Sequence, residues 1–133
     1  MDVNALIALG FREHTSHERV TVWIQGTALA RSREVELLTC SITELGFVRV
    51  ISSAAQYRID VGQARSLLLR LKKSGVLTFM ADHHDMSHLP AWVKTPRQTT
   101  DGHLDALARA HGAVLATLDE HIPGAFIIPP LIS

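Results

Sequence analysis

The sequence is poor in features that mark several specialised classes of protein. Cys40 is the single cysteine among 133 residues, which excludes an intrachain disulfide and favours a reducing compartment. Thirteen basic and thirteen acidic residues leave no formal net charge, so the large basic surface of a general nucleic-acid binder is missing. No segment is apolar for long enough to span a bilayer, and no signal-peptide pattern opens the chain. We therefore expect a cytoplasmic protein without a membrane partner.

The remaining composition is that of an ordinary folded domain. Hydrophobic residues make up 47% of the chain and charged residues 20%, without repeats or low-complexity tracts. A chain of this length suits one domain with a sizeable core, so residues 1–133 are predicted to form a single domain. Cys40 lies in an apolar run and is expected to be buried as a small hydrophobic residue.

Helical and strand-like segments alternate along the chain. Helices are predicted from about residue 4, over 16–31, from 41, from an N-cap at Asp60 to residue 75, and over 101–112. Short apolar runs predict strands over 35–40, 76–81 and 113–118, with a short edge strand over 126–128. This alternation favours a parallel sheet in an α/β domain.

Four acidic residues stand where predicted strands end or predicted helices begin. Asp101 opens a helix, and Asp119 closes the strand that follows it. Glu44 lies one short turn after the strand ending at Cys40, and Asp2 would share this rim if a strand precedes it. Ligands and metals usually bind at this edge of a parallel sheet. We therefore expect the four carboxylates to lie near one another.

A cluster of carboxylates favours a hard divalent cation. Mg²⁺ and Mn²⁺ prefer oxygen ligands, and carboxylates brought close raise one another's pKa unless a cation neutralises them. A cation held in this way can activate water and stabilise charge on a phosphoryl oxygen.

Each acid also has a purely structural interpretation. Glu44 has the N3 spacing of a capping box, and Asp101 has the position of a helix N-cap. Asp119 would start a turn, and Asp2 would be a disordered terminal residue. The two interpretations stay open for each acid at this point.

The helix that begins near Asp101 is expected to orient its two acids differently. Its buried side is predicted to consist of Leu104, Leu107, Ala108 and His111. At about 100° per residue, Asp101 falls at the edge of that side and projects over the sheet rim. Asp105 falls further toward solvent and is expected to be a surface charge.

Four segments, in order, resemble those of a PIN domain. They are residues 2–9 (DVNALIAL), 43–45 (TEL), 97–108 (RQTTDGHLDALA) and 112–119 (GAVLATLD). More narrowly, nearly the whole chain resembles the VapC-type toxin ribonucleases of toxin–antitoxin pairs. The resemblance implies a three-layer α/β fold in which helices flank a central parallel sheet.

The same resemblance implies a function and a set of site residues. Asp2, Glu44, Asp101 and Asp119 match the acidic quartet of the family, with Asn4 and Thr117 as supporting residues. The quartet implies Mg²⁺ or Mn²⁺ and hydrolysis of RNA phosphodiester bonds by a type II toxin. It further implies a homodimer that is inhibited by a cognate antitoxin protein.

One departure from the family pattern concerns the first acid. Family members have several apolar residues before it, and these form a central first strand. Here only Met1 precedes Asp2. We therefore expect a shortened or missing strand in the middle of the sheet.

Eight histidines suggest zinc as an alternative ligand. His14 and His17 are three residues apart, and His83, His84 and His88 lie together in a polar connection. Structural zinc usually has four closed ligands that often include thiolates, so a single cysteine disfavours it. His14 and His17 are expected at the surface or in a dimer contact.

Two other functional classes compete with the ribonuclease. A phosphoacceptor signalling domain also uses acids and Mg²⁺, but it needs a lysine after the last strand. Lys72, Lys73 and Lys94 are the only lysines, and none has that position. A catalytically silent PIN-like module that binds protein or RNA is the main alternative. The basic residues around Lys72 are expected to form a solvated face, or to flank an RNA groove in a dimer.

Overall fold

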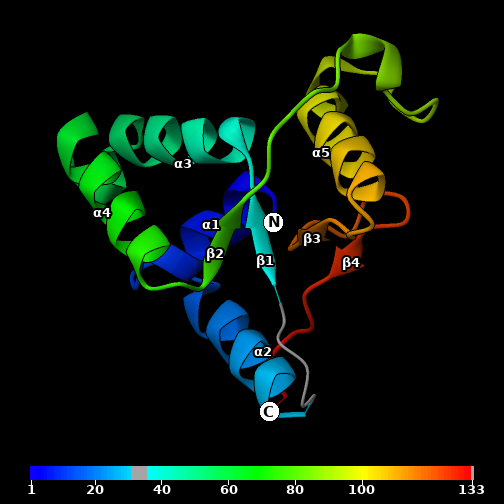
Figure 1. Cartoon of the computed structure of the whole chain (residues 1–133). Coiled ribbons are helices and arrows are strands. Elements are labelled where there is room, and N and C mark those ends of the chain that lie inside the picture. Colours follow the sequence, from blue (N-terminus) through cyan, green and yellow to red (C-terminus); the bar gives the residue numbers. More distant parts are fainter. Residues whose placement is uncertain (31–35, 133) are drawn as a thin grey trace.

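The computed structural model describes residues 1–30 and 36–132 (Figure 1). Within these residues the helices are α1 (Val3–Gly10), α2 (His17–Ala30), α3 (Ser41–Ser53), α4 (Val61–Lys73) and α5 (Thr99–Ala110). The strands are β1 (Leu37–Thr39), β2 (Leu77–Phe79), β3 (Ala116–Thr117) and β4 (Phe126–Ile127). Short 3-10 turns are η1 (Ala55–Tyr57), η2 (Met86–His88) and η3 (Pro96–Gln98). The expected helix end at Arg31 and strand start at Val35 lie outside the described residues.

The paired strands are parallel, as the sequence predicts. β1 pairs with β2 and β3 pairs with β4, so the described strands form two separate two-stranded sheets. Met1 and Asp2 lie between these sheets. The Met1 amine donates to the Leu38 carbonyl at 3.1 Å, and the Asp2 N–H donates to the Ala116 carbonyl at 3.1 Å. Met1 and Asp2 thus link β1 to β3 through one backbone hydrogen bond on each side.

The main hydrophobic core lies beneath the first four helices. α1 is mostly apolar and buries Ala5, Leu6, Ile7 and Ala8. Phe47 and Ile51 of α3 and Leu68 of α4 pack into the same cluster. In Figure 1, α3 and α4 lie on one side of β1 and β2, and α5 lies on the other side near β3 and β4. None of the described helices has the length and hydropathy needed to cross a membrane.

A smaller apolar cluster packs under α5. It includes Cys40, Leu104, Leu107, Leu115 and Ile122. Cys40 is fully buried, as expected. This cluster packs α5 against Leu115, the residue that precedes β3.

Local sequence signals account for several helix ends. The Asp60 carboxylate accepts a hydrogen bond from the Gln63 N–H at 2.8 Å, and the Gln63 side-chain carbonyl accepts one from the Asp60 N–H. This reciprocal capping box confirms the predicted start of α4. Gly75 and Gly112 follow α4 and α5 with φ of 79° and 66°, which glycine adopts without strain.

Two expectations for α5 are wrong. Asp105 was expected at the surface, but it is only 3% exposed. Its carboxylate accepts a hydrogen bond from Arg109 Nε at 3.0 Å. The cause is the connection before α5, which covers a second face of the helix and brings Val93 against Gly102. His111 is exposed because it lies just past the end of the helix.

Candidate active site

Asp2 is held at the start of α1 by two hydrogen bonds. One carboxylate oxygen accepts from the Ala5 N–H at 2.9 Å, which makes Asp2 the N-cap of the helix. The other oxygen accepts from the Thr117 hydroxyl. Asp2 is 6% exposed, so the expectation of a disordered residue is wrong. Burial raises the pKa of its carboxyl group above the usual range.

Asp101 lies in the first turn of α5 and faces the other two aspartates. The helix N-cap is Gln98, so the interpretation of Asp101 as a cap is wrong. Burial, and then the charges of Asp2 and Asp119, raise the pKa of Asp101 to about 6. No basic group offsets these effects among the causes of the shift. Asp101 is therefore a carboxylate that is disfavoured in its charged form unless a cation approaches.

Thr117 joins Asp2 to Asp119 through a single hydroxyl group. It donates to the Asp2 carboxylate, and it accepts from the Asp119 N–H at 2.9 Å. Thr117 is fully buried, so no water competes for either bond. The hydroxyl therefore fixes the first and last acids relative to each other, across 115 residues of sequence.

Asp119 is the most exposed of the three aspartates and has the opposite pKa shift. Its carboxylate accepts from the His121 N–H at 2.8 Å and lies 3.1 Å from the His121 ring. The backbone hydrogen bond from His121 lowers the pKa of Asp119. Asp119 is thus charged across the physiological range, whereas Asp101 beside it is not fully charged below neutrality.

These three aspartates line one cavity of about 300 Å³. Its other lining residues are Val3, Asn4, Ile7, Val50, Thr100 and Leu104. Asn4 is exposed, and its side-chain carbonyl lies 3.1 Å from His14 Nε2. The structure thus brings together three of the four predicted acids and one predicted supporting residue around a single hollow, with the second supporting residue, Thr117, buried behind it.

Glu44 is held apart from this cavity. One carboxylate oxygen accepts from the Thr39 hydroxyl at 2.6 Å, and the other lies 2.8 Å from Lys72 Nζ. The expected capping role is wrong, because α3 is preceded by Cys40 without a side-chain capping bond. Sequence reasoning missed Lys72 as a partner, since the contact joins α3 to the end of α4 across 28 residues.

The donor set suits a hard cation that keeps part of its water shell. Mg²⁺ prefers oxygen ligands and is usually held by one or two carboxylates and several waters. Among the described residues, no group of three or more His, Cys, Asp or Glu side chains lies close enough together to hold a metal ion as the side chains stand. The three aspartates line the cavity as oxygen donors without forming a closed metal site.

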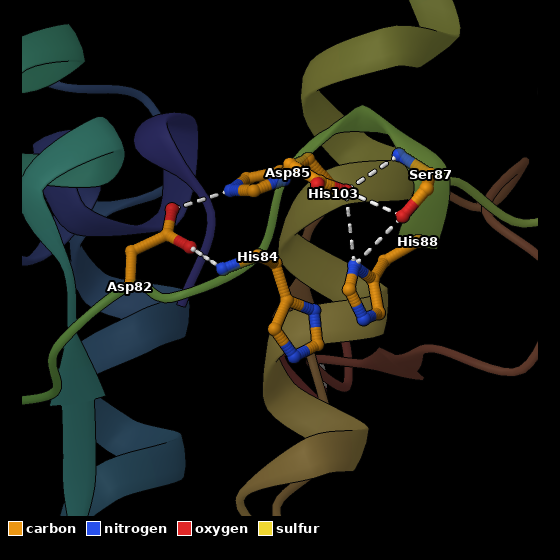
Figure 2. A network of polar contacts seen from close by, with 6 residues as sticks. All are labelled: Asp82, His84, Asp85, Ser87, His88 and His103. Carbon is orange, nitrogen blue, oxygen red and sulfur yellow. Dashed lines mark hydrogen bonds and ion pairs between the residues drawn. The ribbon is translucent and has the colours of Figure 1, made fainter.

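A separate polar network joins the connection before α5 to His103 of that helix (Figure 2). The Asp82 carboxylate contacts the His103 ring and accepts from the His84 N–H at 3.0 Å. The rings of His84 and His88 stack with centroids 4.2 Å apart. The network fastens the connection before α5 to the helix, which steadies the turn that carries Asp101.

The expected surface histidines make contacts within the chain. His14 pairs with Asn4, and His17 Nδ1 lies 2.7 Å from the Ala8 carbonyl. Both histidines connect the start of α2 to α1. His14 therefore steadies a residue on the wall of the acidic cavity.

Comparison with known proteins places this sequence in a family. A family model described as PIN domain matches residues 1–125. The chain belongs to the PIN domain family. Ribonuclease VapC38 of Mycobacterium tuberculosis is 37% identical over 123 residues, which cover 90% of this chain and 83% of that protein. Ribonuclease VapC44 of the same organism is 37% identical over 137 residues, covering 94% and 92%. Ribonuclease VapC29, also from M. tuberculosis, is 30% identical over 135 residues, covering 97% and 95%.

Proposed function

We propose that this PIN-domain chain is a metal-dependent endoribonuclease, the toxin of a type II toxin–antitoxin pair. The observation that carries the proposal is the single cavity shared by Asp2, Asp101 and Asp119, in which the pKa of Asp101 is raised to about 6. Similarity to proteins named ribonuclease VapC supports the same conclusion. The substrate is RNA, and the reaction is hydrolysis of its phosphodiester bonds.

The three aspartates would hold Mg²⁺ or Mn²⁺. A bound cation would supply positive charge for the phosphoryl oxygens and lower the pKa of attacking water. Thr117 keeps the carboxylate of Asp2 and the backbone of Asp119 in fixed relation. Asn4 stands at the exposed edge of the cavity, where its amide can contact a phosphate of the substrate.

Glu44 belongs to the proposed set as the fourth acid. Its carboxylate is bound by the Lys72 ammonium and the Thr39 hydroxyl. A carboxylate has about four lone-pair sites, so these two bonds leave acceptor capacity on Glu44. We propose that Glu44 acts from this position as an outer acid of the site, with its charge partly offset by Lys72.

The proposed partners are RNA, a cognate antitoxin protein and a second copy of the chain, all in the cytoplasm. The support is family membership, together with apolar side chains that α3 and α4 leave exposed, including Leu45 at 64% and Val61 at 60%. Light scattering on the purified chain tests the homodimer. A monomer at micromolar concentration would contradict that part of the proposal. Co-purification with the product of a co-expressed neighbouring gene tests the antitoxin.

Cleavage of structured RNA tests the nuclease itself. The purified chain is incubated with RNA in Mg²⁺ or Mn²⁺ and in EDTA, alongside Asp101→Asn. A matched control is Glu120→Gln, which neutralises an exposed acid beside the site. We expect cleavage only with the cation, retained in Glu120→Gln and lost in Asp101→Asn. Cleavage that persists in EDTA or in Asp101→Asn would contradict the metal-dependent mechanism.

A catalytically silent RNA- or protein-binding module is the alternative. The observation that favours it is the ion pair of Glu44 with Lys72, outside the aspartate cavity. If RNA binds but is not cut with either cation, while a partner protein binds tightly, the silent module is the better description.

A further inference from the structure

Asn4 stands at a position where the direction of its side-chain amide matters. It is exposed, lies in the first turn of α1 and lines the acidic cavity. Among the described residues that line this cavity, Asn4 and Thr100 are the two with a side-chain amide or hydroxyl group. A carbonyl oxygen turned toward the cavity would be a ligand for a cation, whereas an NH₂ group would be a donor for an anion. The orientation of Asn4 therefore decides which of the two it can bind.

His14 contacts Asn4 from outside the cavity. Its Nε2 atom lies 3.1 Å from the Asn4 Oδ1 atom, and His14 is not among the residues that line the acidic cavity. The backbone of His14 is bonded on both sides. Its N–H donates to the Phe11 carbonyl at 3.0 Å, and its carbonyl accepts from the His17 N–H at 2.9 Å. The ring therefore reaches Asn4 from a backbone that is held within the turn before α2.

The second ring nitrogen of His14 determines which way the bond to Asn4 runs. His14 Nδ1 accepts a hydrogen bond from the Ser16 N–H at 3.0 Å. A backbone N–H can only donate, so Nδ1 carries no proton, and the proton of the neutral ring lies on Nε2. Nε2 must then donate, and the Asn4 group that accepts this bond must be the carbonyl oxygen.

The neutral form of the His14 ring is also favoured by its surroundings. Burial, and then the charge of His17, lower the pKa of His14 below its ordinary value. A protonated ring would carry a second hydrogen on Nδ1, directed at the N–H of Ser16. His17 makes a different contact, since its Nδ1 lies 2.7 Å from the Ala8 carbonyl and must donate. His17 thus fastens α2 to the backbone of α1, whereas His14 binds a side chain on the cavity wall.

We propose that His14 is a positioning residue, which holds the Asn4 carbonyl outside the acidic cavity and leaves the Asn4 NH₂ group to donate to a phosphate oxygen of the bound RNA. This inference rests on the proposed function, because it names a contact of the same substrate. The three aspartates repel a phosphate. A donor in the first turn of α1 offsets part of that repulsion, at the helix end where an anion is favoured. Asn4 is accordingly a substrate-binding group and not a ligand of the cation.

Two substitutions of His14 separate the functions of its two ring nitrogens. An asparagine side chain places an amide oxygen near the position of Nδ1, so His14→Asn keeps the acceptor for Ser16 and removes the donor to Asn4. A glutamine side chain places an amide nitrogen near the position of Nε2, so His14→Gln keeps that donor. His17→Gln is the structural control, because it removes the donor to Ala8 and leaves His14 unchanged.

Cleavage of RNA with Mn²⁺ gives kcat and KM for each variant. We expect His14→Asn to raise KM by about tenfold with little change in kcat, because a hydrogen bond to a charged phosphate is weakened in the ground state and the transition state alike. His14→Gln should restore most of the wild-type KM, and His17→Gln should leave KM unchanged. Failure of the His14→Gln rescue, or an equal rise of KM in His17→Gln, would overturn the proposal.

Two further comparisons ask whether His14 acts through Asn4. In an Asn4→Ala background, His14→Asn should have no additional effect on KM, whereas independent roles would give additive effects. The affinity for Mn²⁺ should be the same in the wild type and in His14→Asn, because the Asn4 carbonyl does not bind the cation. Additive effects on KM, or weaker binding of Mn²⁺ to His14→Asn, would overturn the proposal.

A measurement without RNA separates this inference from the proposed function. The nitrogen chemical shifts of the His14 ring at pH 7.5 report which ring nitrogen carries the proton. We expect a protonated Nε2 and an unprotonated Nδ1. A proton on Nδ1 would overturn the inference even if the chain cleaves RNA. If the expected tautomer is found but the wild-type chain cleaves no RNA with either cation, the nuclease and the phosphate contact fail together, while the orientation of Asn4 stands.

Discussion

At the scale of single residues, Asp101 is the group on which the site most depends. Its folded-state pKa is about 6, above the value of about 3.9 for a free aspartate in an unfolded chain. Between these values the folded protein binds more protons than the unfolded chain, so its stability falls as pH rises from about 4 to about 6. Above pH 6, ionised Asp101 therefore destabilises the metal-free fold.

This sign gives a prediction for Asp101→Asn without metal. At pH 7.5 the substitution should raise the melting temperature by a few degrees, because it removes a half-buried charge that lies near two others. At pH 4, where Asp101 is already protonated, the gain should vanish. Thermal unfolding in EDTA at both pH values measures it. Glu120→Gln is the control, and an equal gain at both pH values would contradict the assigned pKa.

Thr117 gives a second prediction at the residue scale. Thr117→Val keeps the shape of the side chain but removes the hydroxyl that donates to Asp2 and accepts from Asp119. A buried acceptor left without its donor costs about 1–3 kcal/mol, so we expect destabilisation of that order. The rate of RNA cleavage should fall by a larger factor than the fraction of folded protein, since the hydroxyl no longer holds Asp2 and Asp119 in position relative to each other. Thr117→Ser should restore activity, and failure of this rescue would contradict the role of the hydroxyl.

At the scale of elements, the sequence predicts those features of helices and strands that depend on neighbouring residues. The Asp60 cap, the parallel pairing, and the gathering of Asp101 and Asp119 at one cavity follow from short-range patterns or from strand–helix alternation. The burial of Asp105 does not follow from such patterns, because the connection before α5 covers a helix face that the helical periodicity assigns to solvent. The Glu44–Lys72 ion pair was missed for a similar reason, since it depends on how α4 packs on α3.

The packing of α5 against its preceding connection gives a third prediction. A Cβ at Gly102 would lie 2.2 Å from Val93 Cγ2, so Gly102→Ala must displace that side chain or the helix start. Overpacking of this kind costs about 1–3 kcal/mol. Gly26→Ala in α2 is the matched control, because a Cβ there meets nothing within 4 Å. Chemical denaturation should show a loss for Gly102→Ala and a gain of about 0.5–1 kcal/mol for Gly26→Ala.

The ion pair between α3 and α4 gives a fourth prediction. In Lys72→Gln, Glu44 loses the nearby ammonium and its charge becomes free to attract a cation. Under the proposed function, we expect Mn²⁺ to bind several-fold more tightly than to the wild-type chain. Lys73→Gln, one residue along the same helix, is the control. Weaker binding in Lys72→Gln would mean that Lys72 supports the site by holding Glu44 in place.

At the scale of the whole molecule, the fold converts remote sequence positions into one acidic cavity. Asp2 enters it from the start of α1, Asp101 from the first turn of α5, and Asp119 from the loop after β3. The four-helix core positions α1, and the smaller cluster around Leu107 positions α5. The β1–β2 sheet and the β3–β4 sheet meet at Met1 and Asp2. The position of the Asp2 carboxylate therefore depends on how the two sheets are joined.

Mn²⁺ binding is the most direct test of the central claim that these three aspartates share one cation. Calorimetric titration at pH 7.5 would compare the wild-type chain with Asp2→Asn, Asp101→Asn, Asp119→Asn and Glu120→Gln. We predict saturable binding to the wild type and to Glu120→Gln, and a loss of about tenfold or more in affinity for each aspartate variant. Wild-type affinity in all three aspartate variants would contradict the account.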